Sequence, residues 1–264
     1  MCDHRFALAL AGALVSFTAS AQFAGSVAAY TPGSGVAASF QNPSAALGAP
    51  TTFIGYQNAD PFNPPYRGSD IVGIGSGGSL TLQLDTPVRN DPTHPFGLDF
   101  IVFGHAGFII TNGDYSGGGI TDGTFFAGGT STSRISVSAD GVTFYTLNPS
   151  LAPNVDGLYP TDAGGNVLTP VNPALTAGSF AGQDLAGIRA LYAGSAGGTG
   201  YDLSWAQDGL GHDVALSAVS FVRIDVSSGP AYLDAISVVP EPSATLLGLL
   251  GAALLAVRRT HVFS

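Results

Sequence analysis

The amino-acid sequence predicts an all-β protein with the fold of an antiparallel β-sandwich. Three observations support this fold class. Several short segments alternate apolar and polar residues with the period of a strand, stretches rich in Gly, Pro, Asn and Ser connect them, and only one segment has a helical pattern. The chain between its two unusual ends is long enough for one domain with a buried core.

The first part of this domain contains loops and a glycine-rich turn. Residues 22–69 are loop-rich, with a first strand expected near residues 52–56. Residues 73–78 read Gly-Ile-Gly-Ser-Gly-Gly, which satisfies the G-x-G-x-x-G pattern of dinucleotide-binding folds. That function requires a helix to follow, whereas residues 79–84 alternate as a strand does. A turn between strands is therefore favoured over a cofactor site.

The middle of the domain contains a central strand and a hairpin. Residues 97–103 are apolar on almost every position, which is typical of a strand covered on both faces. Residues 133–138 alternate strictly, and Asp140-Gly141 predicts a turn into a second strand at residues 142–145.

A short helix and two strands complete the domain. Asp184 is a candidate N-cap for a helix that should stop near Gly194. Residues 219–226 and 232–239 are expected to form the last strands.

The N-terminus predicts export. An apolar run at residues 6–17 follows Arg5, and the small residues Ala19 and Ala21 stand at the spacing that a signal peptidase recognises. We therefore expect residues 1–21 to be a secretory signal that signal peptidase removes.

The C-terminus combines a proline motif, an apolar helix and a basic pair. These parts are Pro240-Glu241-Pro242, the uncharged residues 244–257, and Arg258 with Arg259. The apolar stretch is shorter than the roughly 20 residues that span a bilayer comfortably. By the positive-inside rule, the two arginines should lie on the cytoplasmic side of a membrane-inserted helix.

This order of parts resembles the PEP-CTERM sorting signal of Gram-negative bacteria. The resemblance implies that an exosortase, a membrane transpeptidase-like protease, recognises Pro240, Glu241 and Pro242. Residues 73–108 and the hairpin at residues 135–144 are also similar to the pattern of exported PEP-CTERM cell-surface proteins. That family implies a jelly-roll-like β-sandwich, transient anchoring in the inner membrane, and a final place on the cell surface or in the extracellular matrix.

The expected organisation has four parts. They are a signal peptide at residues 1–21, a loop-rich N-terminal part of the mature domain at 22–69, a β-sandwich core at 70–239, and a sorting signal with a short transmembrane helix at 240–264.

Composition excludes some functions. The chain has no lysine and a net charge of −10, so we expect no nucleic acid as a partner. Its single cysteine, Cys2, lies in the signal, so no disulfide is expected in the mature protein.

Catalysis has little support in the sequence. No G-x-S-x-G motif occurs, and His94, His105 and His212 stand at unrelated spacings. Hydrolysis of a glycosidic bond needs two carboxyl groups, and both would have to be aspartates in this domain. A non-enzyme is therefore expected, with a polysaccharide hydrolase as the alternative.

A structural Ca²⁺ is the favoured inorganic ligand, because this ion prefers carboxylate and amide oxygens in flexible loops. Two sets of candidate ligands stand out. The first is Asn112, Asp114 and Asp122 in a Gly-rich stretch, and the second is Asp99, Asp202 and Asp234 beside apolar strands.

Tyr201 and Trp205 form a polar-aromatic patch of the type that stacks on sugar rings, although a position in the core is favoured for Trp205. We therefore expect a surface module that binds exopolysaccharide, with a ligand-free structural matrix protein as a further alternative.

Overall fold

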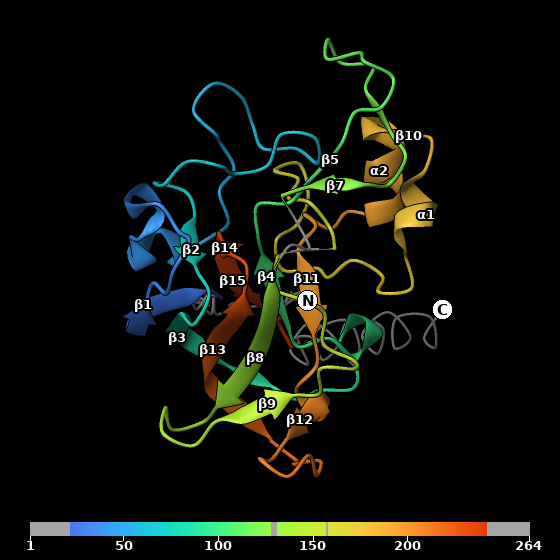
Figure 1. The fold of residues 1–264 in the computed structure, drawn as a ribbon. Helices are drawn as coiled ribbons and strands as arrows, with labels where there is room; N and C mark the ends of the chain where they lie inside the picture. Colours follow the sequence, from blue (N-terminus) through green and yellow to red (C-terminus); the bar gives the residue numbers. More distant parts are fainter. Residues whose placement is uncertain (1–21, 128–130, 157, 242–264) are drawn as a thin grey trace, which may run out of the picture.

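The structure, a computed structural model, describes residues 22–127, 131–156 and 158–241, and it is mostly β with antiparallel sheets (Figure 1). The predicted signal-cleavage residues Ala19 and Ala21 and the predicted sorting residues Pro242, Arg258 and Arg259 lie outside these residues. Within the described part of the chain, no helix is both long and apolar enough to cross a membrane.

Two antiparallel sheets form the body of the domain. The larger sheet has the strand order β1 (Ala24–Thr31), β3 (Ser79–Arg89), β13 (Ala218–Ser228), β8 (Thr132–Ser138), β9 (Tyr145–Leu147) and β12 (Ala206–Gln207). The smaller sheet has the order β11 (Thr199–Tyr201), β4 (Phe100–Phe103) and β15 (Ala235–Val238).

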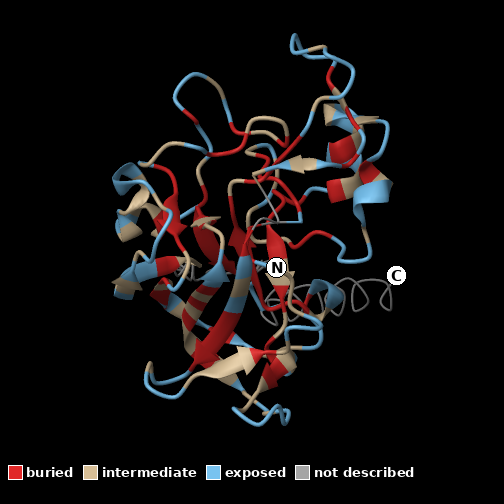
Figure 2. Ribbon diagram, viewed as in Figure 1, coloured by how far each residue is buried: buried red, intermediate tan, exposed pale blue. Residues whose placement is uncertain are grey.

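The main core lies between these sheets. Leu80, Leu82 and Ile224 from the larger sheet belong to the same apolar cluster as Phe100 and Ile236 from the smaller one, and buried positions follow both sheets (Figure 2). Burying one such side chain stabilises the fold by roughly 1.5–3 kcal/mol. The sandwich-like, all-β prediction is therefore confirmed.

The glycine-rich segment is a turn, as predicted. Its first two residues complete β2 (Val72–Ile74), residues 75–78 form the turn, and β3 starts at Ser79 without any helix. Gly77 has a φ of +75°, which favours glycine, and its N–H donates to the carbonyl of Val226 at 2.8 Å. The turn thus joins β2 to β3 beside the end of β13.

The predicted hairpin forms with a wider loop. β8 pairs with β9 through Val137 and Tyr145. The second strand therefore begins at Tyr145, which is the last residue of the predicted strand at 142–145. The carboxylate of Asp140 accepts hydrogen bonds from the N–H groups of Val142 and Thr143 at 2.9 and 2.8 Å. In a strand, the N–H groups of Val142 and Thr143 would donate to a neighbouring strand. Because they donate to Asp140 instead, residues 142–144 stay in the loop.

Several other strand boundaries differ from the prediction, and the central strand β4 starts at Phe100 instead of Gly97. β1 arises within the stretch expected to be loops, whereas residues 52–56 form no strand beyond a single bridge between Phe53 and Asn58. The last predicted strand is divided into β14 (Ala231–Leu233) and β15. The break occurs at Asp234, whose carboxylate turns toward Thr51.

Smaller elements gather beside the sandwich around a second apolar cluster that includes Phe108, Phe180, Ile188 and Tyr192. These elements are β5 (Gly107–Phe108), β6 (Ile120–Thr121), β7 (Phe125–Phe126), β10 (Gln183–Asp184), α1 (Ala177–Phe180) and α2 (Leu185–Tyr192). The short 3₁₀ turns are η1 (Ala38–Phe40), η2 (Pro43–Ala46), η3 (Pro95–Gly97) and η4 (Leu203–Trp205).

Helix α2 confirms the predicted helix. Asp184 caps it by accepting a hydrogen bond from the N–H of Gly187 at 2.8 Å, and Gly194 with a φ of +92° follows its end.

We expect Asp184→Ala to lower the free energy of unfolding by about 1 kcal/mol. Denaturant unfolding measures this, with Asp184→Asn as the control because an amide oxygen still caps. Equal losses in both variants would contradict the capping role.

The two ends of the described chain lie side by side. The N–H of Val238 donates to the carbonyl of Gln22 at 2.7 Å, and Phe23 bridges Ser237. The expected mature N-terminus and the segment before the predicted sorting motif therefore meet at one edge of the smaller sheet.

Candidate functional site

The predicted aromatic patch is divided between core and surface. Tyr201 is fully buried, its ring stacks on Phe100 at 5.3 Å between centroids, and its hydroxyl donates to the carbonyl of Pro153 at 3.0 Å. No face of this ring is open to a sugar. Trp205 is half-buried, contacts Tyr201 edge-on at 6.5 Å, and lines a cavity of about 140 Å³.

The second set of predicted calcium ligands does not converge. Asp99 and Asp234 immediately precede β4 and β15, and the antiparallel register pairs Phe100 with Val238 and Phe103 with Ala235. The two aspartates therefore lie at opposite ends of this ladder, roughly 16 Å apart at 3.3 Å per residue. One ion cannot bind both, which corrects the grouping.

Each member of that set has its own structural role. The carboxylate of Asp99 accepts from the N–H of Leu203 at 2.8 Å, and Asp202 caps η4 by accepting from Ser204 at 2.7 Å. Asp234 accepts from both the N–H and the hydroxyl of Thr51, at 2.9 and 2.8 Å. Burial raises the pKa of Asp99 and raises that of Asp234 to about 7.

The first set lies in an exposed loop that is held by its own hydrogen bonds. Asn112 accepts from the N–H of Ile120 at 3.1 Å, and Asp114 accepts from the N–H and hydroxyl of Ser116 at 2.8 and 2.6 Å. Asp122 accepts from Thr124 in a separate turn. Asn112 and Asp114 thus share one loop, whereas Asp122 supports the next turn.

Asp114 also lines a cavity of about 320 Å³, which we call the Tyr115 pocket. Its walls come from two loops and the start of α2, and the lining residues are Gln57, Asp60, Phe62, Asn63, Ile110, Asp114, Tyr115, Ser116, Gly117, Gly119 and Leu185. The side chain of Tyr115 is largely open to solvent, since 80% of the residue is exposed.

Backbone pairing positions the pocket walls. Strand β6, directly after the Asp114 loop, pairs with β10, directly before α2, so the loop and the helix start are fixed together. Opposite them, Asp60 accepts from the N–H groups of Phe62 and Asn63 at 2.8 and 3.0 Å and thereby closes a tight turn. The pocket is consequently shaped by local hydrogen bonds.

The carboxylates of the pocket are held as acceptors. Hydrogen bonds from Ser116 lower the pKa of Asp114, so this group is ionised at neutral pH. Asp60 accepts two further bonds from the amide of Asn63, at 3.0 and 3.1 Å. An aromatic face beside oriented carboxylates and amides is suited to holding a hydroxyl-rich ligand.

The two described residues of the predicted sorting motif are accessible. Pro240 and Glu241 are exposed, and a carboxylate oxygen of Glu241 lies 3.9 Å from the guanidinium of Arg89. Recognition of this motif by an exosortase stays a prediction.

Sequence reasoning missed the Tyr115 pocket. An aromatic residue flanked by glycines and polar residues, as in Asn-Gly-Asp-Tyr-Ser-Gly, was the available signal.

No known family model matches the chain, and no curated protein is similar enough to match.

Proposed function

We propose that this protein is an exported, exosortase-sorted surface or matrix protein whose β-sandwich domain binds exopolysaccharide without cleaving it. The terminal segments support export, because a secretory signal and a sorting signal flank the domain in the order that such a route requires. Signal peptidase and an exosortase are the processing partners, and a jelly-roll winding of the sandwich is part of the proposal.

The Tyr115 pocket is the observation that carries the binding function. Its exposed tyrosine offers a flat apolar face for the C–H side of a sugar ring. Carboxylate and amide groups of Asp60, Asn63 and Gln57 line the same cavity, where they can bind sugar hydroxyls. A cavity of about 320 Å³ that is open to solvent accommodates a short stretch of a glycan chain.

The ionisation of the pocket favours binding over hydrolysis. A glycosidase requires one carboxyl group that stays protonated because its pKa is raised. Asp114 has a lowered pKa instead, and both oxygens of Asp60 already accept hydrogen bonds. A structural Ca²⁺ at the loop that contains Asn112 and Asp114 is compatible with this environment and belongs to the proposal.

The decisive experiment compares two exposed tyrosines. We expect Tyr115→Ala to weaken retention on exopolysaccharide about 5- to 150-fold, if a sugar ring gains from stacking on tyrosine what a nucleobase gains on an aromatic side chain, on the order of 1–3 kcal/mol. Tyr66→Ala is the matched control, since Tyr66 is also exposed but does not line the pocket. Affinity electrophoresis of the full-length chain in polysaccharide-containing gels measures both.

The other outcomes favour the alternatives. Equal retention by the two variants would reject the pocket, and loss in Trp205→Ala alone would move the site to the smaller cavity. Release of new reducing ends from the polysaccharide would favour the hydrolase, and absence of any retention would favour the ligand-free matrix protein.

A further inference from the structure

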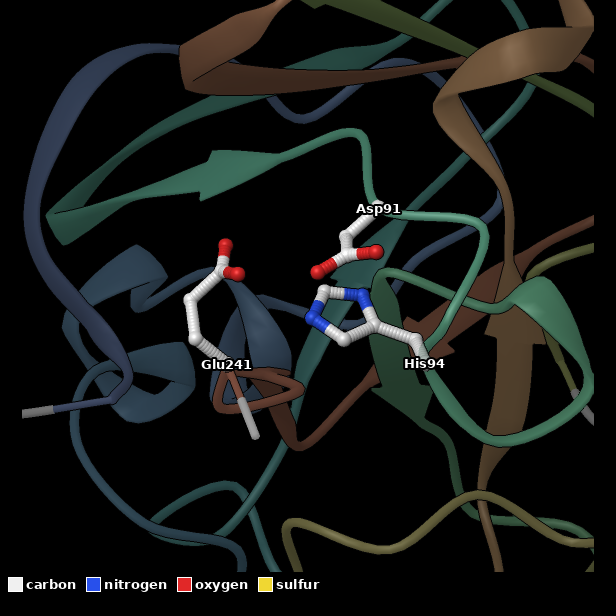
Figure 3. Close-up of side chains that lie close together, drawn as sticks. All are labelled: Asp91, His94 and Glu241. Carbon is white, nitrogen blue, oxygen red and sulfur yellow. The ribbon is translucent and has the colours of Figure 1, made fainter. Parts of the chain in front are cut away.

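Three ionisable side chains converge at the edge of the sandwich where the described chain ends. Asp91 and His94 lie in the loop between β3 and β4, and Glu241 follows β15. Candidate ligand atoms of these three residues all lie within 4.8 Å of one another, and Figure 3 shows a ring nitrogen of His94 turned toward the carboxyl group of Glu241.

His94 presents a free nitrogen to this cluster. The residue is 97% buried, because only 3% of its surface is exposed, and its buried Nε2 atom has no hydrogen-bond partner among the described residues. Its Nδ1 atom lies 2.8 Å from a carboxylate oxygen of the fully buried Asp99. Asp99 therefore favours the tautomer with the proton on Nδ1, which leaves a lone pair on Nε2.

An unpartnered buried nitrogen costs free energy unless something binds it. A carboxylate that holds one imidazole nitrogen while the other coordinates a metal is a recurring arrangement in zinc proteins. The same Asp99 oxygen accepts from the N–H of Asp91 at 3.1 Å, so one buried carboxylate orients two members of the cluster.

The two outer carboxylates complete the set. The hydroxyl and N–H of Thr93 bind one oxygen of Asp91 at 2.7 and 2.8 Å, which fixes the side chain in place. Glu241 faces it from the end of β15, and two facing carboxylates repel each other unless a proton or a cation lies between them. Among residues 22–127, 131–156 and 158–241, the salt-bridge partner of Glu241 is Arg89, at 3.9 Å.

We propose that Asp91, His94 and Glu241 bind a divalent transition-metal ion, with Zn²⁺ as the best fit and Asp99 as the residue that positions His94. An imidazole among the ligands favours this class over Ca²⁺ or Mg²⁺, which prefer oxygen alone. Ligand atoms on one tetrahedral zinc lie roughly 3.4 Å apart, so the cluster must close slightly. Glu241 can supply this movement because 48% of its side chain is exposed.

This metal site does not rest on the proposed carbohydrate function, and none of its residues lines the Tyr115 pocket. Glu241 is the only glutamate of the chain and the centre of the Pro-Glu-Pro motif. A bound ion would therefore fasten the first part of the sorting motif to the loop between β3 and β4.

Calorimetric titration of the chelator-treated full-length chain with ZnCl₂ tests the proposal. We expect one equivalent of Zn²⁺ to bind, and Glu241→Gln and Asp91→Asn each to weaken binding at least tenfold. Both substitutions keep the size of the side chain at half-buried or exposed positions, so folding should survive. Asp208→Asn is the control, because Asp208 forms the exposed pair with His212 that could also attract zinc.

A second measurement addresses the histidine directly. We expect Zn²⁺ to shift the ¹⁵N resonance of His94 Nε2 while Nδ1 keeps its proton, which a purely structural histidine would not show. Zinc affinity unchanged in both cluster variants, or lost only in Asp208→Asn, would overturn the site. Tighter binding of CaCl₂ than of ZnCl₂ at the cluster would overturn the metal class. Because these readouts involve no polysaccharide and no exosortase, they fail or succeed separately from the proposed function.

Discussion

Tyr201→Ala is expected to lower the free energy of unfolding by about 3–5 kcal/mol, the range for removing a large aromatic side chain from a core. The reason is that its fully buried ring stacks on Phe100 between the two sheets. Denaturant unfolding followed by fluorescence of the single tryptophan, Trp205, measures the loss, since this ring contacts Tyr201.

Two variants separate packing from hydrogen bonding. Tyr201→Phe keeps the ring and removes the bond to the carbonyl of Pro153, so it should cost only about 1 kcal/mol. Tyr115→Ala removes an exposed ring and should stay within about 0.5 kcal/mol of the wild type. A loss below 1 kcal/mol for Tyr201→Ala would show that this ring is not part of the core.

Asp234→Asn is expected to remove a large part of the dependence of stability on pH. Burial raises the pKa of Asp234 to about 7 in the folded protein, against its ordinary value of 3.8. The folded state therefore holds the proton more tightly than the unfolded state does. The stabilisation that the protonated Asp234 provides is complete below about pH 4. It is lost as the pH rises to 7, which lowers the free energy of unfolding by up to about 4 kcal/mol.

Asparagine suits this position because its amide can accept from the N–H of Thr51 and donate to the hydroxyl oxygen. Unfolding curves of wild type and variant from pH 4 to 8 give the difference that belongs to this residue. Asp122→Asn is the control, since hydrogen bonds from Thr124 lower the pKa of Asp122 and its effect has the opposite sign. Parallel curves for wild type and Asp234→Asn would contradict the prediction.

The sequence was informative wherever one local rule decided the structure. Alternation placed β3 and β8, and an N-cap aspartate with a following glycine placed α2. The sequence was less informative where pairing with a distant segment of the chain determines the secondary structure. β1 is a strand because it pairs with β3 over a gap of about fifty residues, and its own composition resembles that of a loop.

The same distinction applies to the sites. Tyr201 and Trp205 stand close in sequence, yet one ring is buried and the other half-exposed because β11 ends between them. His94 looked like an isolated loop histidine, since its neighbour Glu241 is 147 positions away in the chain. The nearest sequence signal was the Asp91-Pro-Thr-His94 spacing shortly before Asp99, the residue that precedes β4.

The hydrogen bond between Val238 and Gln22 makes the described fold almost a closed ring. The first and last described residues lie next to each other, so a chain that enters the domain at one end leaves it at almost the same point. Such a unit can be inserted into a surface loop of another protein without stretching either partner. It can also be added to or removed from a longer chain while the path of the flanking sequence is preserved.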